Sequence, residues 1–178
     1  MKRRIGILTV VCLAAVCGAV VFFSSCKITL SGASTKGLKT IYVGFFENDA
    51  PLVVSNLSQD FTEQLKARIR STTDLSIVQT PATADAVLTG SITGYSIAPV
   101  SIQANANSNT PPIANASALT ITVQVKYVNN VTKNLSFDQS FSEPMNFTGD
   151  IAAAQNNLIT TIDKQLTEDV FNKAFANW

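Results

Sequence analysis

Side chains that could perform catalysis or hold a metal ion are few in this chain of 178 residues. It contains no histidine, and its three cysteines, Cys12, Cys17 and Cys26, all lie near the N-terminus. Ser-His-Asp triads, Cys-His pairs and histidine-ligated zinc sites are therefore unavailable. Paired carboxylates could still act as acid and base, but the acidic residues are scattered without a recognisable spacing. We predict that the protein is not an enzyme and has no metal site and no cofactor, with a carboxylate-based hydrolase as the remaining catalytic alternative.

Cys26 is the residue whose surroundings predict a chemical modification. Basic residues at positions 2–4 precede an apolar run, Ile5–Phe23, and two serines separate that run from Cys26. This order of charged, apolar and small residues is typical of a signal peptide, and the cysteine makes it resemble the bacterial lipoprotein signal. We predict cleavage between Ser25 and Cys26, and attachment of a diacylglycerol to the Cys26 sulfur.

The apolar run also has a second interpretation. Its 19 residues are long enough to cross a bilayer as an uncleaved helix. The basic residues before the run and the small residues after it favour the cleaved signal. Cys12 and Cys17 are poorer lipidation candidates, because Cys12 lies early in the run and the bulky Val16 precedes Cys17.

Removal of residues 1–25 leaves residues 26–178, a length typical of one domain. The formal net charge of +1 becomes −2, because the three basic residues of the signal are lost. The mature part has no clustered basic face, so we predict no nucleic-acid partner. It also has no cysteine pair for a disulfide.

Hydrophobic periodicity predicts the elements that follow. Strands are expected at 27–30, 39–46, 75–79, 86–97, 119–127 and 134–142, and helices at about 55–72 and 150–176. Apolar residues recur every four positions in both helices. Those of the first helix are Leu57, Phe61, Leu65 and Ile69, and those of the second are Leu158, Ile162, Leu166, Val170 and Ala174.

Three local signals refine this pattern. Asn56 with Gln59 resembles a capping box for the first helix, and Asp150 can cap the second. Gly90 and Gly94 interrupt a strand, which predicts a bulge or the close approach of another backbone. Residues 103–117 carry little apolar surface and predict a mobile loop, and residues 143–149 predict a shorter one.

Together these elements predict an α+β fold, a two-layer sandwich in which two helices pack on one face of a mostly antiparallel mixed sheet of about four strands. Residues 119–127 alternate strictly between apolar and polar side chains. The sheet should therefore have one buried face and one polar face.

The order of motifs along the mature chain resembles the lipopolysaccharide-assembly lipoprotein family (LptE). After the lipidated cysteine, these motifs are LSGAS at 30–34, IYVGFFEN at 41–48, LSQDFTE at 57–63, LTGSITGY at 88–95, LTITV at 119–123 and DVFNKAFANW at 169–178. The resemblance rests on this series over the full length rather than on any single motif.

The resemblance implies an outer-membrane lipoprotein on the periplasmic face, anchored through acylated Cys26. Its partners would be lipopolysaccharide and the β-barrel translocon that it plugs and assembles. A polar sheet face suits the polar lumen of such a barrel. In the family, basic side chains meet the lipopolysaccharide phosphates, which makes Lys126 and Lys133 the candidate contacts here. Ordinary solvated lysines are the alternative interpretation of both.

The first half of the chain also resembles periplasmic lipoproteins that assemble secretion pores or serve transport complexes. The strand-helix-strand order and the segment DAVLTGSI at 85–92 carry this second resemblance. It implies an assembly module rather than a lipid-handling plug.

Overall fold

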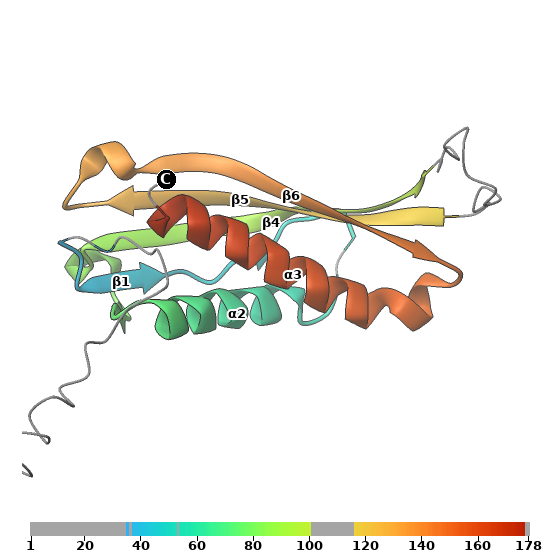
Figure 1. The fold of residues 1–178 in the computed structure, drawn as a ribbon, viewed down its shortest axis with the longest axis horizontal. Coiled ribbons are helices and arrows are strands. Elements are labelled where there is room, and N and C mark those ends of the chain that lie inside the picture. Colours follow the sequence, from blue (N-terminus) through green and yellow to red (C-terminus); the bar gives the residue numbers. More distant parts are fainter. Residues whose placement is uncertain (1–34, 36, 53, 101–115, 177–178) are drawn as a thin grey trace, which may run out of the picture. The chain divides into compact units, whose positions relative to one another are not determined.

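The computed structural model describes residue 35 and residues 37–52, 54–100 and 116–176, all within the unit Gly32–Trp178. These residues form one mixed sheet and two helices (Figure 1). In chain order the elements are β1 (Thr40–Val43), β2 (Glu47–Asn48), α2 (Leu57–Thr72), β3 (Ser76–Val78), β4 (Ala86–Val100), β5 (Ala116–Asn129), β6 (Phe137–Thr148) and α3 (Ile151–Phe175). Short 3-10 helices, η1 (Pro81–Thr83) and η2 (Lys133–Leu135), precede β4 and β6.

The sheet has six strands in the order β3-β1-β4-β5-β6, with β2 also paired to β4. The pairs that involve β1, β2 and β3 are parallel, and β4-β5-β6 is an antiparallel meander. The α+β class is confirmed, but the expectation of about four strands was too low. The strand expected at 39–46 is shorter than predicted and ends at Val43 as β1, and β2 follows at Glu47–Asn48, beyond the predicted range. Between these two strands the backbone N–H of Phe46 donates to Thr62 Oγ1 of α2 at 3.1 Å.

Strand β6 extends well beyond the predicted strand at 134–142. The residues expected to form a loop at 143–149 continue the strand as far as Thr148, paired with β5 without a register shift. Met145 and Phe147 keep the inward alternation and pack partly buried against the core. Pro144 is tolerated because β6 lies at the edge of the sheet, where a missing N–H need not break a ladder.

Helix α2 confirms its predicted stripe, since Leu57, Phe61, Leu65 and Ile69 are all buried. The predicted capping box is wrong. Asn56 adopts a left-handed conformation, with φ of 70°, and its side chain makes no capping hydrogen bond.

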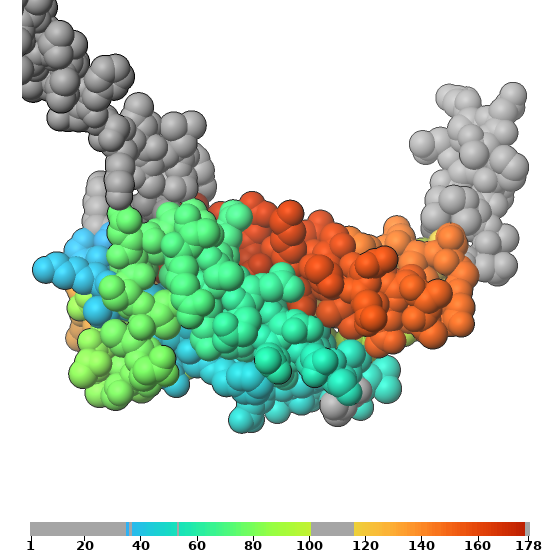
Figure 2. Space-filling model, turned by 90° about the horizontal axis from the view of Figure 1, so that it is seen from below, coloured from blue at the N-terminus to red at the C-terminus, as the bar shows by residue number. Residues whose placement is uncertain are grey.

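Helix α3 begins as predicted, because Asp150 Oδ1 accepts a hydrogen bond from the Ala152 N–H at 3.0 Å. Both helices cover the same face of the sheet, and Figure 2 shows them side by side on that surface. Across their contact, Arg68 of α2 forms an ion pair with Glu168 of α3 at 3.1 Å, and its guanidinium lies 5.4 Å from the centre of the Phe171 ring.

The two strand glycines have the predicted roles. A Cβ atom on Gly90 would lie 2.0 Å from the Gln124 carbonyl oxygen and 2.6 Å from the Phe46 ring, so the neighbouring backbone requires glycine there. The register of β4 against β5 shifts between Ile92 and Gly94, which is the predicted bulge. The strand expected at 27–30 and most of the loop expected at 103–117 lie outside the described residues, and Ala116 and Ser117 already belong to β5.

Asp85 ties the start of β4 to the start of β1. Its Oδ2 atom accepts hydrogen bonds from the backbone N–H groups of Lys39 and Thr40, at 2.8 and 2.9 Å, and from the Thr40 hydroxyl at 3.0 Å. The two backbone hydrogen bonds, followed by that of the hydroxyl, lower the pKa of Asp85. The carboxylate form is therefore the one that aligns these two parallel strands.

Candidate functional site

The sheet face opposite the helices is polar, as the alternation at 119–127 predicted. The inward residues of β5 from Leu119 to Tyr127 are fully buried, while the intervening outward ones remain partly or fully exposed. The outward positions of β4, β5 and β6 carry mainly hydroxyl and amide groups, namely Thr89, Ser91, Ser96, Thr120, Thr122, Gln124, Ser140, Ser142 and Asn146. We call this the open face.

Hydrogen bonds link the outward side chains of β5 and β6. Thr122 Oγ1 lies 2.9 Å from Ser142 Oγ. The side-chain amide of Gln124 donates to Asp138 and accepts from the Ser140 hydroxyl. These contacts hold the polar side chains in place, so the open face presents an ordered polar surface rather than a catalytic pocket.

Lys126 and Lys133, the two predicted lipopolysaccharide contacts, lie on different elements. Lys126 is exposed on the open face, opposite Asp138 in the strand register. Lys133 is exposed in η2, the connection between β5 and β6. Within the described ranges neither ammonium lies within 4 Å of a carboxylate, because the ion pairs there join Lys66 to Glu63 and Arg68 to Glu168. Both charges are therefore available to an outside anion.

A hollow of about 590 Å³ lies between the C-terminal part of α3 and the first part of β6. Phe137 and Phe141, half-buried, form its aromatic floor, with ring centres 6.2 Å apart. The other lining residues are Asn134, Leu135 and Ser136 before the strand, and Asp169, Asn172, Lys173 and Ala176 on the helix side. We call this the α3/β6 groove; it was not predicted, because it depends on which strand the helix end contacts.

Two acidic groups on the helix side of the sheet were also missed. Asp163 is completely buried on α3, and neither of its carboxylate oxygens has a hydrogen-bond partner. Burial, and then the charge of Asp60 on α2, raise the pKa of Asp163 to about 7. Its spacing of four from both Ile159 and Thr167, which are buried on α3, is the signal that could have identified it.

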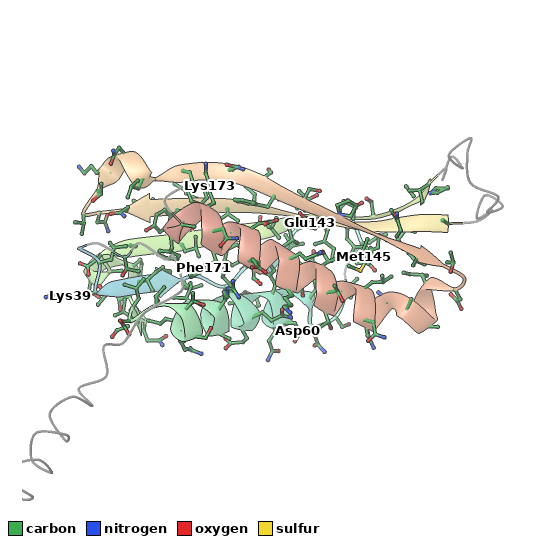
Figure 3. All side chains as sticks on the ribbon, in the orientation of Figure 1. Lys39, Asp60, Glu143, Met145, Phe171 and Lys173 are labelled. Carbon is green, nitrogen blue, oxygen red and sulfur yellow. The ribbon has the colours of Figure 1, made fainter. Side chains whose placement is uncertain are left out.

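Glu143 of β6 meets Asp169 of α3, and Figure 3 shows Glu143 where the strand and the helix approach each other. Burial raises the pKa of Glu143, and the hydrogen bond and charge of Asp169 raise it further. A proton shared by the two groups would join this strand to the helix. No group of three or more potential metal ligands occurs among the described residues.

Cys26 and Ser25 lie outside the described residues, so lipidation and cleavage stay predictions. In the part of the chain that the structure covers, neither helix combines the length and the apolar character needed to cross a bilayer.

A family model described as LptE, lipopolysaccharide-assembly, matches residues 38–174. No curated protein sequence gives a significant match. Among solved structures, a neuraminyllactose-binding hemagglutinin homologue from Helicobacter pylori is similar with a TM-score of 0.53 and 10% identity, over 84% of this chain and 89% of that one. The hypothetical protein CT253 from Chlamydia trachomatis is similar with a TM-score of 0.52 and 13% identity, over 79% of this chain and 100% of that one. At these identities the two structures support the fold alone.

Proposed function

The chain belongs to the lipopolysaccharide-assembly (LptE) family, and from this we propose that it plugs and assembles the β-barrel translocon that delivers lipopolysaccharide to the outer leaflet. The observation that carries the proposal is the family match over residues 38–174, which includes both helices up to Ala174 and all six strands. The protein acts without catalysis in this proposal, by binding and positioning its partners. It sits on the periplasmic face of the outer membrane.

The open face supports a role inside a barrel. Its hydroxyl and amide groups match the polar lining of a large transmembrane barrel, where an apolar surface would be unfavourable. The opposite face of the sheet is already covered by α2 and α3. A barrel wall can therefore contact the open face without any rearrangement of the core.

Depletion of the protein in its own bacterium tests this function. We expect lipopolysaccharide to decrease at the cell surface, because the translocon is no longer assembled. It should accumulate on the inner side of the outer membrane or at an earlier stage of its transport to that membrane. Surface labelling of lipopolysaccharide measures the first effect. Unchanged surface lipopolysaccharide after complete depletion would contradict the proposal.

Cys26 anchors the domain in this proposal, through acyl chains that each contribute about 0.8 kcal/mol per buried methylene. In the variant Cys26→Ser we expect loss of lipid labelling and failure of signal processing at Ser25. Metabolic labelling with palmitate and the apparent mass of the product measure these effects. Cys17→Ser is the matched control and should be labelled and processed normally. A Cys26→Ser protein that still incorporates palmitate would show that another residue carries the lipid.

Lys126 on the open face and Lys133 in η2 are the proposed contacts for the phosphates of lipopolysaccharide. Replacing each by alanine in the full chain should weaken lipopolysaccharide binding by about 2- to 5-fold, as expected for loss of one solvent-exposed ion pair that contributes about 0.5–1 kcal/mol. Lys164→Ala is the matched control, because it removes the same charge from an exposed position on α3. Equal affinities for all three variants and the wild type would assign both lysines to ordinary solvated positions.

A further inference from the structure

The free edge of β6 is long and only partly protected. The strand pairs with β5 over all 12 of its residues, and no other described strand pairs with its second side. The opposite edge of the sheet, β3, has only 3 residues. Exposed edges carry unpaired N–H and C=O groups that can bind another strand, and proteins usually block them with lysines, prolines, inward charges or bulges. Glu143 and Pro144 block the second half of β6 in this way. The only charged side chain in residues 137–142 is Asp138, which lies on the open face, away from the helices, and interacts with Gln124.

The α3/β6 groove runs beside this unprotected half. Its floor consists of Phe137 and Phe141, and Leu135 at its end is 38% exposed. Its second wall is the last part of α3, which contributes the exposed side chains of Asn172 and Lys173. Figure 3 shows Lys173 near the end of that helix, beside β6. A free strand edge, an aromatic floor and a helix wall therefore border one hollow of about 590 Å³, a size typical of ligand-binding sites.

Two charged side chains line the groove, Asp169 and Lys173. Asp169 already interacts with Glu143, so Lys173 is the charge that favours an acidic occupant. The Lys173 ammonium lies 5.9 Å from the centre of the Phe137 ring, and it makes no ion pair with any carboxylate of the described residues. An occupant of the groove that displaced water from the Lys173 ammonium would have to supply an anionic group, because a charge that loses its water without gaining a partner is unfavourable.

We propose that the α3/β6 groove binds an extended segment of a partner polypeptide as an additional strand of the sheet. The backbone of the segment pairs with β6 residues 137–142. Its apolar side chains, at alternate positions, lie on Phe137 and Phe141, and an acidic side chain pairs with Lys173. This mode of recognition takes affinity from main-chain hydrogen bonds and specificity from alternate side chains. It does not depend on lipopolysaccharide transport and goes beyond the proposed function.

An acyl chain is the competing occupant, because it could also cover the aromatic floor. An acyl chain in the groove would exclude water from the N–H and C=O groups of the strand edge and from the side chains of Asn172 and Lys173. Because it has no polar groups along its length, it would leave all of them without hydrogen-bond partners. A polypeptide segment satisfies these groups, and the structure therefore favours it.

Selection of 12-residue peptides from a random display library on the purified full chain tests the proposal. We expect enriched peptides with alternating apolar residues and at least one Asp or Glu, which slow amide hydrogen exchange in residues 137–142. Methylation of alternate backbone nitrogens on one side of such a peptide should weaken binding at least 10-fold, while the same change on the other side has little effect. Lys173→Glu should weaken binding about 10-fold, and Lys164→Glu, on the same helix but outside the groove, should leave it unchanged.

Three outcomes would overturn the proposal. The first is that no peptide is enriched, and the second is that enriched peptides leave hydrogen exchange in β6 unaltered. The third is that dodecanoate, tested in parallel, protects the groove while no peptide does, which would identify an acyl-chain site.

Discussion

Replacing Asp163 by asparagine is expected to remove most of the pH dependence of stability between pH 5 and pH 8. The wild-type chain should lose about 3 kcal/mol of its free energy of unfolding over this range, and the Asp163→Asn variant should lose much less. At pH 8 the variant is then the more stable protein. Urea unfolding of both chains at a series of pH values measures the difference.

The sign of this effect follows from the buried carboxyl. Its pKa is about 7 in the folded chain against an ordinary value of 3.8, because burial and the charge of Asp60 disfavour the ionised form. Below pH 3.8 both states hold the proton, and the carboxyl costs no ionisation energy. As the pH rises to about 7, the unfolded state has lost its proton while the folded state still binds it, so stability falls. Above pH 7 the folded state ionises too, and the loss is complete.

Asp60→Asn provides a matched control for this prediction. Asp60 is exposed on α2, and its charge is the second of the two causes that raise the pKa of Asp163. Its replacement should therefore reduce the pH dependence by only a minor part. An Asp163→Asn variant with the full slope of the wild type would show that other groups cause the pH dependence.

Phe61→Ala is expected to lower the free energy of unfolding by about 3–5 kcal/mol. The Phe61 side chain is completely buried, and its ring packs edge-on against that of Phe46, with ring centres 5.1 Å apart. This contact connects α2 to the segment between β1 and β2, so the substitution leaves a cavity where the helix meets the sheet. Urea unfolding at one pH measures the loss.

Phe45→Ala is the matched control for this cavity. Phe45 is the neighbour of Phe46 in the sequence, but its side chain is 58% exposed. Its truncation should cost under about 1 kcal/mol, as for most surface substitutions. A similarly small loss for Phe61→Ala would mean that the helix does not depend on this contact.

The periodicity of apolar residues predicted most of the fold, because each main helix and strand buries one side and exposes the other. The four-residue stripe of α2 and the alternation of β5 each identified a buried face that the structure confirms. The extension of β6 was missed because Glu143 and Pro144 are typical of loops. Their place on an edge strand, with Glu143 held by Asp169, depends on tertiary contacts that a local pattern does not contain.

The candidate sites were less predictable than the fold for the same reason. The polar face followed from Thr120, Thr122 and Gln124, which alternate with buried residues. The α3/β6 groove instead requires the end of α3 to lie beside Phe137, some 35 residues earlier in the chain. Asp163 was assigned to no buried face, because an acidic residue on a helix is usually solvated.

The proposed function depends on which membrane protein the chain binds, so isolation of that partner tests the function most directly. The full chain, carrying an affinity tag in its own bacterium, is purified from detergent-solubilised membranes, and the proteins and lipids that accompany it are identified by mass spectrometry. We expect to recover a large outer-membrane β-barrel of the lipopolysaccharide translocon, together with lipopolysaccharide. Recovery of a ring-forming secretion pore or an inner-membrane transporter, without that barrel, would contradict the proposed function.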